Sequence, residues 1–150
     1  MKRIASIAVL AGLTFAAGAA LAHDDAYLDT QKAPNGGQLR MAGPNHYELV
    51  LVKDAKEVRE NPVVVYVTDH AGQKIPTAGA AGTATILAGK LKAAATLKPD
   101  GDNRMKGVAK YASTPDTKVV VSITLAGKQP EQARFTPLAV AKDTHTDHTH

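Results

Sequence analysis

The sequence predicts an all-β domain, an antiparallel β-sandwich of about seven or eight short strands. Two observations predict it. Apolar and polar residues alternate with a period of two in several short runs between residues 47 and 135, which is the pattern of strands with one buried face. Turn sequences rich in glycine, proline and aspartate separate these runs, and the strands therefore recur about every ten residues, as in a sandwich.

The first 22 residues have the pattern of an export signal. Lys2 and Arg3 precede an uncharged segment, residues 4–21, and the small-x-small sequence Ala20-Leu21-Ala22 follows it. Signal peptidase accepts this pattern. A retained membrane anchor is the alternative, but the segment is rich in alanine and glycine and only weakly hydrophobic. We expect cleavage after Ala22 and a periplasmic or secreted protein that begins at His23.

The composition after cleavage is that of a single small domain. The chain contains no cysteine, so a fold outside the cytoplasm has no disulfides and no cysteine-linked lipid to rely on. The formal net charge of +4 falls to +2 without Lys2 and Arg3. The remaining basic residues are scattered along the sequence and have no aromatic residues between them for base stacking. The sequence therefore predicts no nucleic-acid partner. Removal of the signal leaves no expected membrane partner.

Residues 23–37 are expected to form an irregular lead-in, closed by Asn35-Gly36-Gly37, and residues 38–138 the sandwich. The run 63–68 is almost wholly apolar and should form a central strand. Turns are expected at Asp69–Gly72, 88–89, 99–103 and 126–128, because each of these segments contains a glycine. The alternating runs are residues 47–51, 63–68, 83–87, 91–97, 119–125 and 133–135.

Residues 65–76 read VYVTDHAGQKIP. This run resembles the strand, Asp-x-x-Gly and proline signature of small bacterial immunoglobulin-like domains, similar to YtkA/FixH-type domains and to modules associated with periplasmic heavy-metal efflux adaptors. The segments GGQL at 36–39 and HYEL at 46–49 resemble the same efflux-associated group. The resemblance covers about residues 35–136 and implies an immunoglobulin-like sandwich. Relatives often have a histidine before the double glycine, whereas this chain has Asn35.

His23 is the first candidate metal ligand. As the first residue after cleavage it offers both its α-amine and an imidazole nitrogen to one ion, and such ligands suit Cu(II), Ni(II) and Zn(II). The arrangement resembles that of periplasmic copper carriers of the CopC type, which pair an N-terminal histidine with an immunoglobulin-like sandwich. The alternative is that cleavage leaves a histidine at a flexible end by chance.

His46 and Glu48 are the second candidate pair. At positions i and i+2 of a strand they share a face, roughly 7 Å apart at their Cα atoms. That face is opposite the apolar face of Tyr47 and Leu49, so we expect both side chains to be exposed or half-exposed. They could add ligands to an ion held by His23, or they could form an ordinary polar strand face. His70 lies in a turn and is a weaker candidate.

The third candidate is the tail, residues 139–150. His145, His148 and His150 are half of the six histidines of the chain. Residues 143–150 contain no apolar side chain, so we expect the tail to be disordered. Histidine-rich segments bind divalent metals loosely, and a solvated tail without a role is the alternative.

The catalytic inventory is small. Ser113 and Ser122 are the only serines after residue 22, and neither lies in a Gly-x-Ser-x-Gly sequence. There is also no phosphate-binding loop and no His-Glu-x-x-His motif. We therefore expect a non-enzymatic accessory protein that buffers a copper, zinc, nickel or cobalt ion, or passes it to a periplasmic efflux adaptor. The alternative is an immunoglobulin-like interaction or assembly module whose histidines are incidental.

Overall fold

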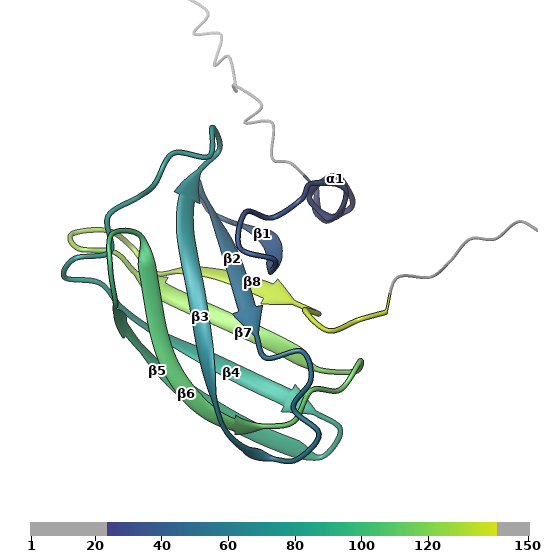
Figure 1. Ribbon diagram of the computed structural model, residues 1–150. Coiled ribbons are helices and arrows are strands. Elements are labelled where there is room, and N and C mark those ends of the chain that lie inside the picture. The colour runs from purple at the N-terminus through teal and green to yellow at the C-terminus, as the bar shows by residue number, and fades with distance from the viewer. Residues whose placement is uncertain (1–23, 141–150) are drawn as a thin grey trace, which may run out of the picture.

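A computed structural model describes residues 24–140 of the chain (Figure 1). The predicted signal peptide, His23 and the tail histidines His145, His148 and His150 lie outside these residues. In the described part of the chain one short helix precedes eight strands: α1 Asp25–Thr30, β1 Gln38–Ala42, β2 Asn45–Leu51, β3 Arg59–Asp69, β4 Ala81–Ala88, β5 Leu91–Pro99, β6 Arg104–Tyr111, β7 Lys118–Thr124 and β8 Glu131–Phe135. Within residues 24–140 no helix is long and apolar enough to cross a membrane.

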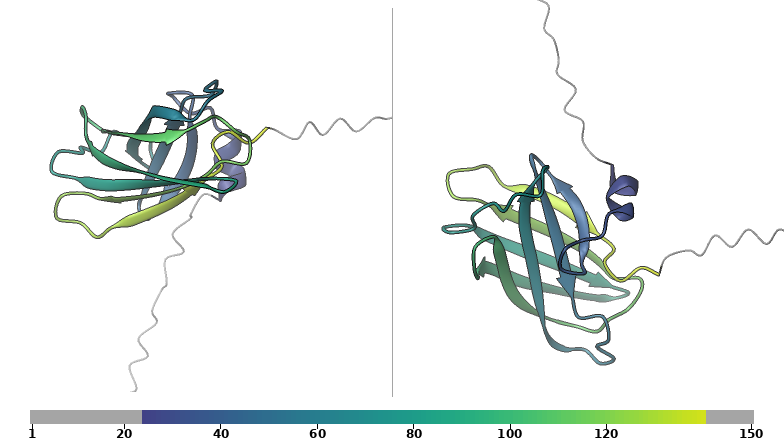
Figure 2. Two further views of the ribbon diagram at one scale, coloured as in Figure 1. Left: turned by 90° about the horizontal axis from the view of Figure 1, so that it is seen from below. Right: turned by 45° about the horizontal axis from the view of Figure 1, so that its top comes forward.

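The eight strands form one antiparallel sheet in the order β1-β2-β3-β6-β5-β4-β7-β8. The sheet curls over itself until β1 and β8, the two ends of the order, lie close together, which gives a nearly closed, barrel-like shape (Figure 2). The predicted all-β, antiparallel class is confirmed, and so is the interior position of the apolar strand β3, which pairs with both β2 and β6.

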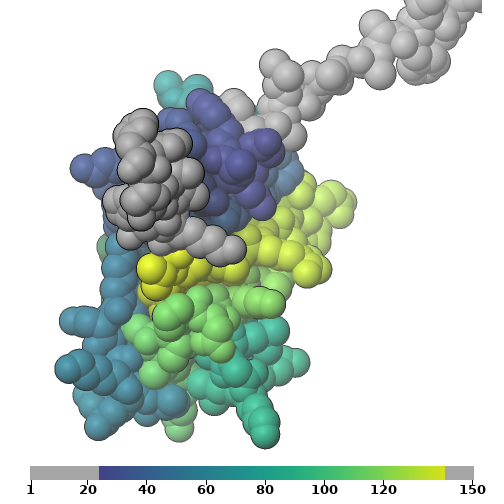
Figure 3. All heavy atoms as spheres, turned by 90° about the vertical axis from the view of Figure 1, so that its right-hand side faces the viewer, coloured from purple at the N-terminus to yellow at the C-terminus, as the bar shows by residue number. Residues whose placement is uncertain are grey.

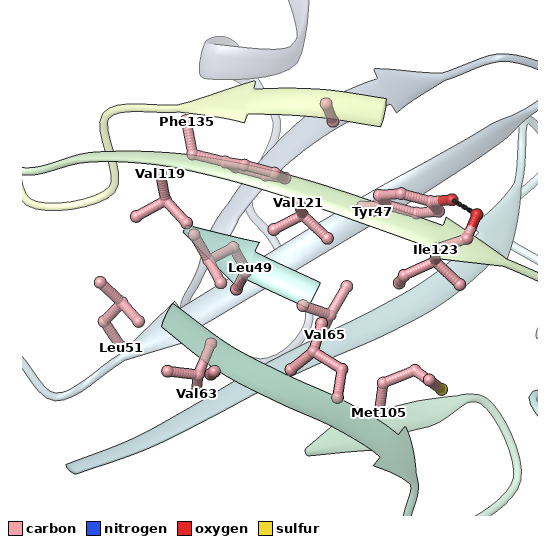
Figure 4. Close-up of a cluster of buried hydrophobic side chains, with 14 of the residues drawn as sticks. Tyr47, Leu49, Leu51, Val63, Val65, Met105, Val119, Val121, Ile123 and Phe135 are labelled. Atoms are coloured by element: carbon pink, nitrogen blue, oxygen red, sulfur yellow. Dashed lines mark hydrogen bonds between the residues drawn. The ribbon is translucent and has the colours of Figure 1, made fainter. Parts of the chain in front are cut away.

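The inward faces of the strands enclose a single apolar core (Figure 4). Tyr47 and Leu49 of β2 are fully buried against residues from the opposite half of the sheet. The Tyr47 hydroxyl reaches across this core to the carbonyl oxygens of Ile123, at 3.5 Å, and Glu131, at 3.4 Å. The largest fully buried side chains include Tyr47, Tyr111, Leu49, Ile86, Leu97, Met105 and Ile123.

The turns follow the sequence prediction, whereas three elements do not. The β4–β5 and β7–β8 hairpins turn at Gly89, φ +58°, and Gly127, φ +70°, which lie within the predicted turn segments. Strands β1 and β6 and the helix α1 were not predicted, and α1 replaces part of the irregular lead-in expected for residues 23–37. The helix begins there because the Asp24 side chain caps it, accepting a hydrogen bond from the Tyr27 amide at 2.8 Å.

Strand β6 meets β5 very closely at Gly107. A Cβ atom at this position would lie 2.4 Å from the carbonyl oxygen of Thr96. Backbone cannot move aside as a flexible side chain can, so glycine is required for the two strands to approach here. Regular pairing between β5 and β6 is limited to two residue pairs, Lys98 with Lys106 and Pro99 with Met105.

The buried phenol of Tyr47 should make the fold sensitive to alkali. Burial raises the pKa of Tyr47 well above its ordinary value, and the negative charge of Glu131 raises it further. The unfolded chain loses this proton near pH 10 while the folded chain keeps it, so the stability due to Tyr47 is complete below pH 10 and falls as the pH rises above that.

We expect Tyr47→Phe to remove part of this alkaline loss. Near pH 7 the variant should cost under about 1 kcal/mol, because the two hydrogen bonds that it removes are long. Urea unfolding at several pH values from about 7 to 11 measures both effects. Tyr66→Phe, at a half-buried tyrosine, is the control. A wild-type and a Tyr47→Phe protein that lose stability equally above pH 10 would contradict this account.

Candidate functional site

A pocket of about 540 Å³ lies on the outer face of β2 and β3, beside α1. Its walls come from α1 and the segment after it, from β2 and β3, and from the turn that follows β3. The residues that line it are Tyr27, Leu28, Gln31, Lys32, Pro34, Asn35, Leu39, His46, Glu48, Tyr66, Thr68, His70, Ala71, Gly72, Lys74 and Asn103. Both predicted strand ligands, His46 and Glu48, are therefore in one pocket.

His46 lies beside a second histidine, His70. The two imidazole rings meet edge to face, with their centroids 4.9 Å apart. Strand pairing explains this contact, because Thr68 is the partner of His46 across β2 and β3, and His70 follows two residues later. The turn that carries His70 is fixed by Asp69, whose carboxylate accepts hydrogen bonds from the amides of Ala71 and Gln73, each at 2.9 Å.

The predicted exposure of His46 and Glu48 is wrong. His46 is 7% exposed and Glu48 is 3% exposed. The two side chains do share the outer face of β2, as the period-two pattern predicted, but α1 and the segment up to Gly37 cover that face. His70, by contrast, is exposed. The histidine pair therefore has one buried member and one member open to solvent.

The carboxylate of Glu48 holds the covering segment in place. It accepts hydrogen bonds from the amide of Asn35 at 2.9 Å, from the amide of Gly37 at 2.9 Å and from Nδ2 of Asn35 at 2.9 Å. Gly37 also approaches β2 so closely that a Cβ atom there would lie 2.3 Å from the carbonyl oxygen of Leu49. Asn35, at the position where the resemblance expects a histidine, thus binds Glu48 and forms part of the pocket wall.

The helix α1 is attached to the sheet by one apolar and two ionic contacts. Leu28 is buried, at 2% exposure. Arg40 of β1, with a side chain only 9% exposed, lies 2.8 Å from the carboxylate of Asp29 and 3.5 Å from that of Asp25. Figure 3 shows α1, in purple, beside the C-terminal residues of the fold, in yellow. These contacts position the helix whose Tyr27 and Leu28 line the pocket.

No protein-family model, curated protein or solved structure matches this chain. Among residues 24–140 no group of three or more histidine, cysteine, aspartate or glutamate side chains is arranged to hold a metal ion. The pair His46 and His70 supplies two imidazoles, and a complete metal site needs donors from elsewhere.

His70, the weaker candidate in the sequence, lies in the pocket beside His46. A histidine in a polar turn carries little information on its own. The signal that could have identified it is the pairing of β2 with β3. If the apolar runs 47–51 and 63–68 form an antiparallel pair, the turn after the second run lies next to the beginning of the first. Residue 70 then lies close to residue 46.

We expect Arg40→Gln to loosen α1 without unfolding the sheet. The variant removes both ion pairs, but the aspartates are 67% and 53% exposed, and the cost in overall stability should be only about 1 kcal/mol. Amide hydrogen exchange of residues 25–31 should become roughly tenfold faster, because local opening no longer breaks these contacts. Mass spectrometry of the exchanging peptides measures this. Arg59→Gln, which removes the exposed Arg59–Glu57 pair, should leave exchange in this segment unchanged. Equal effects of the two variants would contradict attachment of α1 by Arg40.

Proposed function

We propose that this chain is an exported, periplasmic metal-binding accessory protein that holds a divalent copper, zinc, nickel or cobalt ion. The observation that carries the proposal is the His46–His70 pair, with ring centroids 4.9 Å apart, in a pocket of about 540 Å³. Imidazole nitrogen is a common ligand for each of these metals. The buried position of His46 favours an ordered site over loose binding at the surface.

The remaining donors in this proposal come from His23, which lies outside the described residues. Asp24 directly follows His23 and caps α1, and Tyr27 of the same helix lines the pocket. A chain that begins at His23 offers an imidazole and an α-amine nitrogen for each ion. Together with His46 and His70 they make a set of four nitrogens, which suits Cu(II) best among these metals.

Glu48 and the tail take supporting roles. The Glu48 carboxylate already accepts hydrogen bonds from Asn35 and Gly37, so we assign it to holding the pocket wall in preference to binding the ion directly. The tail histidines His145, His148 and His150 would collect metal at low affinity. From the pocket the ion would be buffered or passed to a periplasmic efflux adaptor, the partner that the resemblance implies.

The proposal includes an immunoglobulin-like sandwich as the finer description of the fold, and a role without catalysis. A second candidate function is an interaction or assembly module with incidental histidines. The observation in its favour is that no group of three metal-binding side chains is found among residues 24–140. The two functions differ in one measurable property, because only the first requires metal binding tighter than that of a simple histidine peptide.

Titration calorimetry of the exported protein with Cu(II) and Zn(II) distinguishes the two functions. We expect one tight site per chain, plus weaker binding that disappears when residues 143–150 are deleted. One alanine added before His23 moves the α-amine away from the imidazole, and Cu(II) affinity should then fall at least roughly tenfold. An affinity unchanged by the added residue contradicts the N-terminal chelate. Binding no tighter than that of a short histidine peptide contradicts the metal function altogether.

A further inference from the structure

The fold gathers onto one surface lysines that are spread along the sequence. Lys92 and Lys98 of β5 and Lys106 and Lys110 of β6 are all exposed. They alternate with inward residues such as Leu97 and Met105, so all four point away from the core. We call this surface the lysine face. The basic residues look scattered along the sequence, whereas the pairing of β5 with β6 brings Lys98 and Lys106 side by side.

Two of these lysines are direct cross-strand neighbours. Lys98 is paired with Lys106, and like charges in this position destabilise a sheet. Lysines often protect the edge of a sheet from pairing with another chain, but β5 and β6 are interior strands in the order of the sheet. Protection of a sheet edge therefore does not explain why the two lysines are neighbours. Binding of an anionic ligand would explain it.

The acidic groups near the lysine face offset only part of its charge. Glu60 of β3 is the partner of Lys110. Asp100 forms an ion pair with Arg104, at 2.8 Å, and Asp102 lies exposed in the same β5–β6 turn. Lys106 is flanked by Lys98 on β5 and by the uncharged Val64 on β3, so neither cross-strand partner neutralises it. The lysine face therefore keeps a net positive charge.

The lysine face fits a flat, anionic surface better than another protein. Its middle is occupied by Val108, 56% exposed, and by Pro62, the partner of Val108 on β3. None of its four lysines lines the metal-site pocket or four other surface pockets of the described residues. Protein interfaces are enriched in aromatic residues and arginine and depleted in lysine. Lysines around a small apolar centre suit phosphate headgroups over a hydrocarbon layer.

We propose that the lysine face binds the surface of an anionic phospholipid bilayer, reversibly and without insertion of a helix. This interaction is separate from the proposed metal site, since His46 and His70 lie beside α1 and none of the four lysines lines their pocket. It would keep the protein at the membrane surface. The proposal does not depend on metal binding.

Co-flotation with vesicles tests the proposal on the exported protein, whose N-terminus is first established by mass spectrometry. We expect binding to vesicles with about one quarter phosphatidylglycerol in phosphatidylcholine, little binding to phosphatidylcholine alone, and loss of binding between about 50 and 500 mM KCl. The double variant Lys98→Gln/Lys106→Gln should bind roughly twentyfold more weakly. Its thermal midpoint should equal or exceed that of the wild type, because a repulsive pair is removed.

The matched control is Lys118→Gln/Lys128→Gln, which removes the same charge from β7 and from the turn after it. This control should retain most of the vesicle binding. An equal loss in both double variants would show a dependence on net charge alone and would overturn the proposal. A wild-type protein that does not bind phosphatidylglycerol vesicles would also overturn the proposal, even if it binds an acidic protein. Vesicle binding that persists at high salt would overturn it as well.

Discussion

Replacing Glu48 by alanine is expected to lower the free energy of unfolding by about 3 kcal/mol. The Glu48 side chain is 3% exposed and accepts hydrogen bonds from two backbone amides, those of Asn35 and Gly37, and from Nδ2 of Asn35. Alanine leaves these donors without their acceptor in a partly buried place. A bond to a charged acceptor is worth more than a neutral one, and several are lost together.

Urea unfolding measures this change, with two variants for comparison. Glu48→Gln keeps one acceptor oxygen and should cost about 1 kcal/mol. Glu57→Ala removes a glutamate whose side chain is 77% exposed, and should change stability by less than about 0.5 kcal/mol. If Glu48→Ala behaves like Glu57→Ala, the carboxylate does not hold the segment that covers β2. We also expect the alanine variant to bind metal more weakly, because Asn35 belongs to the pocket wall.

The double variant His46→Gln/His70→Gln is expected to weaken Cu(II) binding roughly a hundredfold. Both imidazoles of the pocket are lost, while glutamine preserves much of the volume and polarity of each side chain. If the ion stabilises the folded protein, the rise in thermal midpoint on adding Cu(II) should shrink in parallel. Titration calorimetry and thermal unfolding, with and without the ion, measure these two quantities on the same samples.

A matched control removes two histidines from the tail. His145→Gln/His148→Gln eliminates the same number of imidazoles but leaves the pocket intact. We expect it to reduce only the weak binding and to leave the tight site and the metal-induced thermal shift unchanged. If the tail variant loses the tight site and the pocket variant keeps it, the ordered site lies in the tail and the pocket pair has another role.

The strands that could be predicted are those with strong alternation. Strand β3, with Val63, Val65 and Val67 fully buried, is visible in the sequence as an apolar run. Strand β6 is not, because Gly107 and Ala109 interrupt its inward face between the large buried side chains of Met105 and Tyr111. The close approach of β5 requires glycine at residue 107. The neighbouring strand therefore causes the gap in the apolar alternation of β6.

The candidate site was predictable in its parts but not in its assembly. The period of two placed His46 and Glu48 on one face of one strand. That period does not say whether another segment covers the face, and α1 with Asn35 covers it. The hydrogen bonds of Glu48 to Asn35 and Gly37 join residues 11 to 13 positions apart in the sequence, so the role of this carboxylate depends on tertiary structure.

The pair of histidines depends on the register of two strands. Thr68 is the partner of His46, and His70 is brought to the pocket only because β2 and β3 pair in this register. A shift of one residue would move His46 to the opposite face of β2 and separate the two rings. His46 could be named as a candidate ligand from its residue type alone. Its neighbour His70 could be found only from the pairing of β2 with β3.

Pulsed electron paramagnetic resonance of the Cu(II) complex tests the pocket pair most directly, because it counts the imidazoles bound to the ion. The sample is residues 23–142 of the chain, loaded with less than one Cu(II) per chain. We expect nitrogen modulation from at least two imidazoles, reduced by one in His70→Gln. A spectrum from a single imidazole that is unchanged by His70→Gln would contradict metal binding by His46 and His70.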